Sequence, residues 1–130
     1  MGLKLETMCI VLDSGNSEEL SAFYEKLLGW TRVEHKPDDE WIVVHSEKND
    51  GSPGLIFQQA ENYTRPVWPD IPNKQQQMMH LDFHVDNLVE GVAYALSCGA
   101  VLSEVQFDDS YRVMLDPAGH PFCILPKLFS

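Results

Sequence analysis

The stretch NSEELSAFYEKLLG (16–29) contains all the signals of one amphipathic helix. Asn16 can act as the N-cap, Glu19 stands three residues later as in a capping box, and Gly29 suits a left-handed C-terminal stop. Apolar residues recur on one face at helical spacing: Leu20, Phe23, Leu27 and Leu28. The same signals return in NLVEGVAYALSCG (87–99), so the chain is predicted to contain two copies of one helical unit.

Short apolar runs flank both helices in the same order, one before the helix and three after it. The predicted strands are 5–13, 30–36, 40–47 and 54–60 in the first copy, and 78–86, 101–107, 111–116 and 121–127 in the second. The sequence therefore predicts an α+β fold with two β-α-β-β-β modules, 1–60 and 77–130, joined by a linker at 61–76 within a single domain. Each module leaves one sheet face uncovered. We expect the two faces to curl into a cup-shaped mixed sheet that binds a ligand on its concave side.

Composition narrows the classes of function. The 130 residues suffice for one globular domain. Acidic residues outnumber basic ones by 20 to 9, which gives a net charge of −11. This balance argues against nucleic acid or an anionic membrane as a partner, because both attract basic surfaces. It serves solubility, and it would also suit a cationic ligand.

The cysteines and the N-terminus indicate a compartment. Three cysteines, an odd number, lie in apolar settings, which is typical of reduced thiols in a cytoplasmic protein. The N-terminal stretch is too short and too interrupted for a signal peptide, and no apolar run is long enough to span a bilayer. We therefore predict a cytoplasmic protein.

Several motifs carry a family resemblance. LSAFYEKLLGW (20–30), MHLDFHVDN (79–87) and LDPAGHPFCIL (115–125) together resemble the vicinal oxygen chelate superfamily, which includes glyoxalase I, extradiol dioxygenases, and bleomycin and fosfomycin resistance proteins. RPVWPDIP (65–72) with QQMMHLD (76–82) is similar to its glyoxalase-like branch. The resemblance implies the glyoxalase/bleomycin resistance fold and a homodimer. It specifies a reaction only weakly, because one fold serves many activities.

The resemblance also implies a set of metal ligands. Metal-dependent members take ligands from the first and last strand of each module, and these positions fall on His80, Glu6, Cys123 and Ile56, with Gln58 two residues further on. His80 and Glu6 are competent ligands, and Cys123 can bind zinc as a thiolate. Ile56 cannot coordinate a metal. The resemblance thus implies a divalent metal (Zn, Ni or Mn) with an incomplete ligand set, or no cofactor.

The alternating residues His80, Asp82 and His84 are predicted to share one face of a strand, with Leu81, Phe83 and Val85 packed under the helix. In a functional interpretation His80 is a metal ligand or general base, oriented by Asp82, with His84 beside them. Alternatively, the three form a solvated polar face.

Three further residues have two interpretations each. Glu6 is either an acid or base across the cup or an exposed residue of a frayed strand. Cys123 is either a nucleophile or a small buried apolar residue. Trp68, in the proline-rich linker, either covers the edge of the cup and contacts the ligand or anchors the linker by packing.

Two functions follow as hypotheses. The first is a small-molecule-binding protein with metal-assisted lyase or isomerase activity, with His80 and Glu6 as catalytic residues and metal ligands. Its substrate would contact Asp82, His84, Trp68, Gln58 and Cys123. The second is a metal-free protein that sequesters a drug, as bleomycin resistance proteins do. A structural interaction module is a third option, and it would have a filled or shallow cup.

Overall fold

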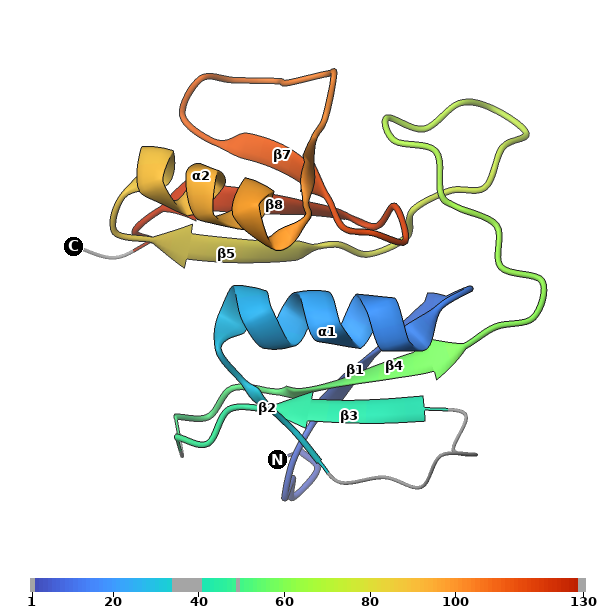
Figure 1. Ribbon diagram of the computed structural model, residues 1–130, viewed down its shortest axis with the longest axis vertical. Helices are drawn as coiled ribbons and strands as arrows, with labels where there is room; N and C mark the ends of the chain where they lie inside the picture. The colour runs from blue at the N-terminus through green and yellow to red at the C-terminus, as the bar shows by residue number, and fades with distance from the viewer. Residues whose placement is uncertain (1, 34–40, 49, 129–130) are drawn as a thin grey trace. The chain divides into compact units, whose positions relative to one another are not determined.

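The computed structural model describes residues 2–33, 41–48 and 50–128 (Figure 1). The chain divides into two compact units, Met1–Tyr63 and Thr64–Ser130. Each unit contains one helix and one four-stranded mixed sheet. The predicted α+β class and the repeated β-α-β-β-β order are confirmed.

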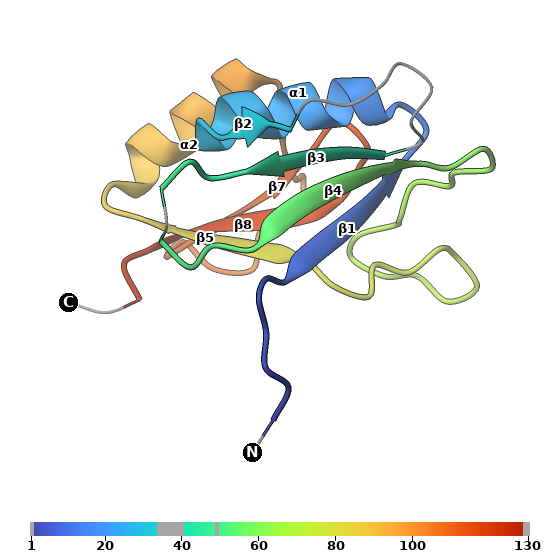
Figure 2. The ribbon, with the colours of Figure 1, turned by 90° about the horizontal axis from the view of Figure 1, so that it is seen from below.

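Unit one consists of β1 (Cys9–Ser14), α1 (Ser17–Leu28), β2 (Thr31–Arg32), β3 (Trp41–His45) and β4 (Gly54–Gln59). Its strand order is β1-β4-β3-β2, and Figure 2 shows β4 between β1 and β3. The pair β1 and β4 is parallel, and the other pairs are antiparallel.

Unit two repeats this plan with β5 (Leu81–Val85), α2 (Leu88–Cys98), β6 (Val101–Leu102), β7 (Arg112–Leu115) and β8 (Pro121–Pro126). Its strand order is β5-β8-β7-β6, with β5 parallel to β8. Neither helix of the described chain has the length and apolar character needed to cross a membrane.

The helix caps follow the sequence signals closely. The Asn16 and Asn87 side chains accept hydrogen bonds from the backbone N–H of Glu19 and Glu90, each at 3.0 Å. Gly29 and Gly99 end the helices in the left-handed conformation, with φ of 67° and 114°. The predicted reciprocal half of the first capping box is wrong, because the Asn16 N–H donates to Ser14 Oγ at 2.9 Å.

Strand boundaries depart from prediction at three places. The first strand begins at Cys9 and the fifth at Leu81, so residues 5–8 and 78–80 lie outside them. The sixth ends at Leu102 because the Gln106 side chain takes over the pairing: it accepts from the Val113 N–H and donates to the carbonyl oxygens of Ser103 and Val113. The end of the predicted strand 30–36 and the first residue of 40–47 lie outside the described residues.

Each helix covers one face of its own sheet. In unit one, Leu20, Phe23 and Tyr24 of α1 are buried with apolar residues of β3 and β4, and the rings of Tyr24 and Phe57 stack at 5.4 Å. In unit two, a Cβ at Gly91 of α2 would lie 3.2 Å from a Val85 methyl group and 3.3 Å from one of Ile124, so the helix sits close to the sheet. The opposite face of each sheet is free of its helix.

Candidate ligand-binding site

The helix-free face of unit two carries the polar residues that the sequence singled out. Strand register places Asp82 beside Cys123, which in turn lies beside Val113. Phe83 points to the other face, where its ring contacts that of Phe122 at 5.7 Å. The predicted alternation of Asp82 and His84 against the apolar residues of β5 is therefore confirmed.

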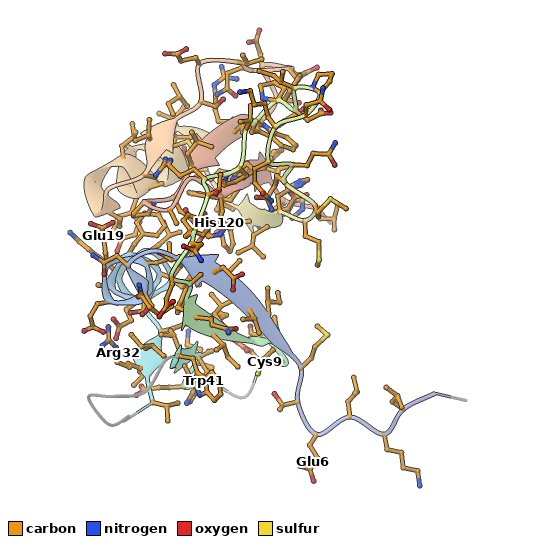
Figure 3. All side chains as sticks on the ribbon, turned by 90° about the vertical axis from the view of Figure 1, so that its right-hand side faces the viewer. Glu6, Cys9, Glu19, Arg32, Trp41 and His120 are labelled. Atoms are coloured by element: carbon orange, nitrogen blue, oxygen red, sulfur yellow. The ribbon has the colours of Figure 1, made fainter. Side chains whose placement is uncertain are left out.

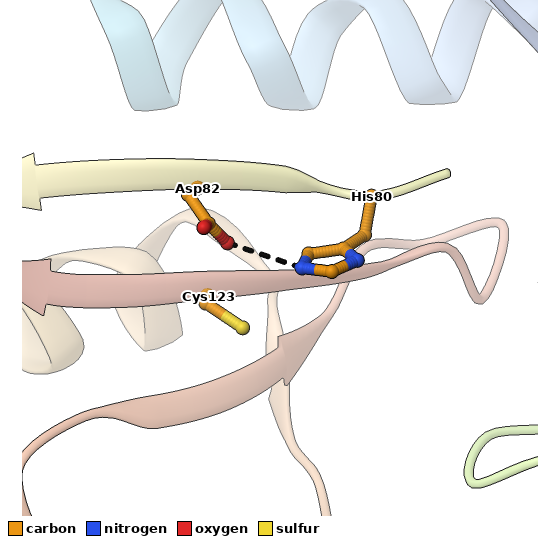
Figure 4. Close-up of side chains that lie close together, drawn as sticks. All are labelled: His80, Asp82 and Cys123. Atoms are coloured by element: carbon orange, nitrogen blue, oxygen red, sulfur yellow. Dashed lines mark ion pairs between the residues drawn. The ribbon is translucent and has the colours of Figure 1, made fainter. Parts of the chain in front are cut away.

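Three polar side chains meet on this face (Figure 4). His80 stands just before β5, and its Nε2 lies 3.2 Å from Asp82 Oδ1. The potential ligand atoms of His80, Asp82 and Cys123 all lie within 4.8 Å of one another. They form the polar cluster of the site.

The Cys123 thiol is protonated at neutral pH. Burial raises its pKa to about 11, and the negative charge of Asp82 and a hydrogen bond to that carboxylate act in the same direction. The thiol therefore donates to Asp82. Because a thiolate is the reactive form of cysteine, this arrangement does not support Cys123 as a nucleophile.

A buried turn holds β8, and with it Cys123, against β7. The Asp116 carboxylate accepts hydrogen bonds from the backbone N–H groups of Ala118 and His120, each at 2.9 Å. Its other oxygen lies 2.8 Å from His120 Nδ1. Asp116 and His120 (the latter labelled in Figure 3) thus hold the turn 116–120 between β7 and β8.

A pocket of about 380 Å³ opens beside the polar cluster. Its lining combines the cluster with aromatic and aliphatic side chains: Trp68, His80, Asp82, Phe107, Tyr111, Val113, Cys123 and Leu125. The Trp68 ring lies 5.7 Å from that of His80 and 6.5 Å from that of Phe107, which it meets nearly at a right angle. The pocket therefore has aromatic walls and one polar end.

Two hydrogen bonds hold the segment around Trp68 in place within unit two. The Val67 N–H donates to the Gln75 carbonyl oxygen at 2.8 Å, and Arg65 donates to the Pro117 carbonyl oxygen at 2.9 Å. The Trp68 indole N–H is buried and has no hydrogen-bond partner among the described residues.

The other predicted site residues lie elsewhere. His84 shares the face of Asp82, but its Nδ1 lies 2.8 Å from the Pro126 carbonyl oxygen, and His84 does not line the pocket. Gln58 is half-buried on β4 of unit one, opposite Asp13 and Trp41. Their predicted substrate-binding roles stay predictions.

Glu6 lies in the segment that leads into β1 and is exposed (Figure 3), so its predicted place within a strand is wrong. The helix caps also align the two units differently from the prediction. Cys9 stands as far before the cap Asn16 as His80 does before Asn87, which makes Cys9 the positional counterpart of His80. Glu6 and Cys9 line a separate pocket of about 540 Å³ in unit one.

The sequence analysis assigned neither Phe107 nor Tyr111 to a site, although both line the pocket. Strand parity now assigns Tyr111 to the pocket face with Val113, whereas Met114 is fully buried on the other face. Phe107 comes after the short β6, in a segment predicted to be strand. No signal in its own sequence indicated that it would line a pocket.

Solved structures show the same fold. A glyoxalase/bleomycin resistance protein/dioxygenase family enzyme from Burkholderia phytofirmans PsJN is 19% identical, with 89% of this chain and 94% of that chain covered and a TM-score of 0.64. TnmS3, an antibiotic binding protein from Streptomyces sp. CB03234, is 14% identical, with 97% and 100% covered and a TM-score of 0.61. The trypanothione-dependent glyoxalase I of Leishmania major is 15% identical, with 95% and 87% covered and a TM-score of 0.61.

A search of curated proteins found no match. The family model for the glyoxalase-like domain matches residues 9–125, which is most of the chain and runs from the first residue of β1 to the last but one of β8. The chain therefore belongs to the glyoxalase-like domain family, within the vicinal oxygen chelate superfamily.

Proposed function

We propose that the protein binds a small organic molecule in the pocket of unit two. The observation that carries this proposal is the joining of aromatic walls to a polar cluster in one concave site. Such a combination is typical of ligand pockets, where apolar surface supplies affinity and a few polar groups fix orientation. Solved structures with the same fold include one described as an antibiotic binding protein and one described as glyoxalase I, which supports a small-molecule ligand.

An NMR screen of small organic compounds tests this proposal. The chain has three tryptophans, and Trp68→Phe assigns the indole signal of Trp68 by its loss. Binding in the pocket should shift the Trp68 signal and leave those of Trp30 and Trp41 in place. A chemically diverse library in which no compound moves the Trp68 signal would contradict the proposal.

Metal-assisted lyase or isomerase activity is the second candidate, and the polar cluster favours it. Imidazole, carboxylate and thiol donors lie close enough together to fit Zn²⁺, whereas Mn²⁺ prefers oxygen donors. His80, Asp82 and Cys123 would hold the ion, in place of the predicted pair of His80 and Glu6, and Cys123 would have to lose its proton to bind as a thiolate. Bound zinc would supply Lewis-acid polarisation of a substrate oxygen. If the site binds no metal, we propose sequestration of a ligand without chemistry.

Calorimetry with Zn²⁺, Ni²⁺ and Mn²⁺ separates these alternatives. A metal-assisted enzyme should bind one Zn²⁺ per chain, more tightly than the other two ions, and at least tenfold more weakly in His80→Ala and Cys123→Ser, whereas a metal-free binding protein should bind none of the three ions. His84→Ala is the matched control, because His84 shares the face but not the cluster. Equal losses in His80→Ala and His84→Ala would rule the cluster out as the zinc site. Assembly as a cytoplasmic homodimer stays a prediction.

A further inference from the structure

We infer that the pocket of unit two selects organic cations: an ammonium or amidinium group carried on an apolar body. This inference rests on the proposed function in its metal-free form, because the cation would be the ligand of that same pocket and would use the Asp82 carboxylate that a zinc ion would otherwise neutralise. It is carried by the placement of aromatic rings around a single carboxylate.

The walls of the pocket present ring faces and edges at steep angles to one another. Trp68 meets Phe107 at an interplanar angle of 88° and His80 at 55°, and Tyr111 completes the aromatic lining. Rings at steep angles cannot all stack on one flat ligand. They can surround a compact group, and the negative faces of aromatic rings attract a cation within about 6 Å of their centres.

Asp82 provides the charge at the polar end, where its side chain is 45% exposed. The Cys123 thiol donates one hydrogen bond to this carboxylate, and His80 Nε2 lies 3.2 Å from its Oδ1. A carboxylate has about four acceptor positions. Asp82 therefore keeps acceptor capacity for a ligand.

Among the described residues, no lysine or arginine lines the pocket to neutralise Asp82. Arg112, on β7, is engaged outside the lining: its guanidinium donates to the carbonyl oxygens of Asp108 and Tyr111 and lies 3.6 Å from the Asp109 carboxylate. The −11 charge of the chain adds a long-range attraction for cations.

The alternative ligand classes are disfavoured at this site. An anion would be repelled by Asp82 and would meet no fixed positive charge in the lining. A neutral apolar ligand would pack against the aromatic walls, but it would displace water from the Asp82 carboxylate without offering a hydrogen bond or a positive charge in return. Such desolvation of a charged group costs binding free energy. A cation avoids both penalties.

The test compares two compounds of nearly the same shape, 3-hydroxyphenyltrimethylammonium and its uncharged isostere 3-tert-butylphenol. Their dissociation constants are measured from the shift of the Trp68 indole signal at low ionic strength. We expect the cation to bind at least tenfold more tightly than the isostere. Asp82→Asn should remove that preference.

Asp86→Asn is the matched control. It changes the net charge by the same amount in the same unit, but Asp86 is 84% exposed, pairs with Lys127 and lies outside the pocket lining. The preference should survive in this variant, with the amide spectrum confirming that both variants are folded.

Equal affinities for the two compounds would overturn the inference while leaving a small-molecule pocket in place. Equal loss of the preference in both variants would also overturn it, because net charge and not Asp82 would then be the cause. If neither these compounds nor any in the screen shifted the Trp68 signal, the proposed function would fail, and the inference with it.

Discussion

Cys123 and Cys9 are unpaired cysteines in opposite environments. Cys123 is buried, 6% exposed, and its raised pKa keeps it a thiol, whereas Cys9 is exposed. With a pKa of about 11, about one Cys123 side chain in a thousand is ionised at pH 8. The two cysteines, on β1 of unit one and β8 of unit two, thus lie in very different surroundings within one short chain.

We predict that iodoacetamide at pH 8 modifies Cys9 well before Cys123. Peptide mass spectrometry over a time course measures both rates, and Cys9→Ser should remove the fast phase only. Asp82→Asn should speed the reaction of Cys123, because it removes the charge that opposes ionisation. Comparable rates at the two cysteines of the native protein would show that Cys123 is not held as a thiol.

The same pKa sets a limit to stability at alkaline pH. The folded pKa lies above the ordinary value of 9.0, so the unfolded chain loses this proton first as pH rises. The contribution of the Cys123 proton to the free energy of unfolding is therefore complete below pH 9, and it declines between pH 9 and about 11.

The sequence named all three members of the polar cluster: alternation paired Asp82 with His80, and the resemblance set Cys123 with His80. It did not predict the contact of Asp82 with Cys123. Alternation along one strand correctly placed Asp82 and His84 on a common face. The contact of Asp82 with Cys123 depends on the register between two parallel strands nearly forty residues apart, which local pattern does not encode. The counterpart of His80 was also predicted wrongly, as Glu6. Aligning the two N-caps, Asn16 and Asn87, gives Cys9 instead.

At the scale of elements, the N-caps of α1 and α2 have the same residue type and the same hydrogen bond. Each asparagine accepts a hydrogen bond from the third residue of its helix at the same distance. Because this bond satisfies a backbone donor that the helix leaves free, Asn16→Ala and Asn87→Ala should each lower the free energy of unfolding by about 1 kcal/mol.

Urea unfolding measures both losses. Asn→Asp at the same positions is the control, since aspartate also caps and its charge suits a helix N-terminus. If the alanine variants were as stable as the aspartate variants, the caps would not contribute as described.

The helices were more predictable than the strands, for a physical reason. Caps, apolar spacing and terminal glycines are local signals, and α1 and α2 match them within one residue at each end. A strand ends where its partner stops supplying hydrogen bonds, and that partner is distant in sequence. Gln106 illustrates this, because its side chain replaces the strand pairing that the apolar run 101–107 suggested.

At the scale of the whole molecule, the repeated β-α-β-β-β order predicts the fold, but the candidate site is lined both by residues of the repeated strands and by residues of the segments between them. Asp82, Val113 and Cys123 come from strands of the repeated plan. Trp68 and Phe107 come from segments between the strands and helices. The sequence indicated the first group through periodicity, but the second follows no period and could be located only in the structure.

The two units also differ in the connection before their last strand. In unit one it covers 46–53 and helps to line the pocket of that unit, whereas in unit two it is the turn 116–120, three residues shorter. Such a pattern, shared strands and helices with unlike connections, is what tandem duplication followed by divergence leaves behind. Ligand preference can therefore change through the connecting segments in each half while the strands and helices stay as they are.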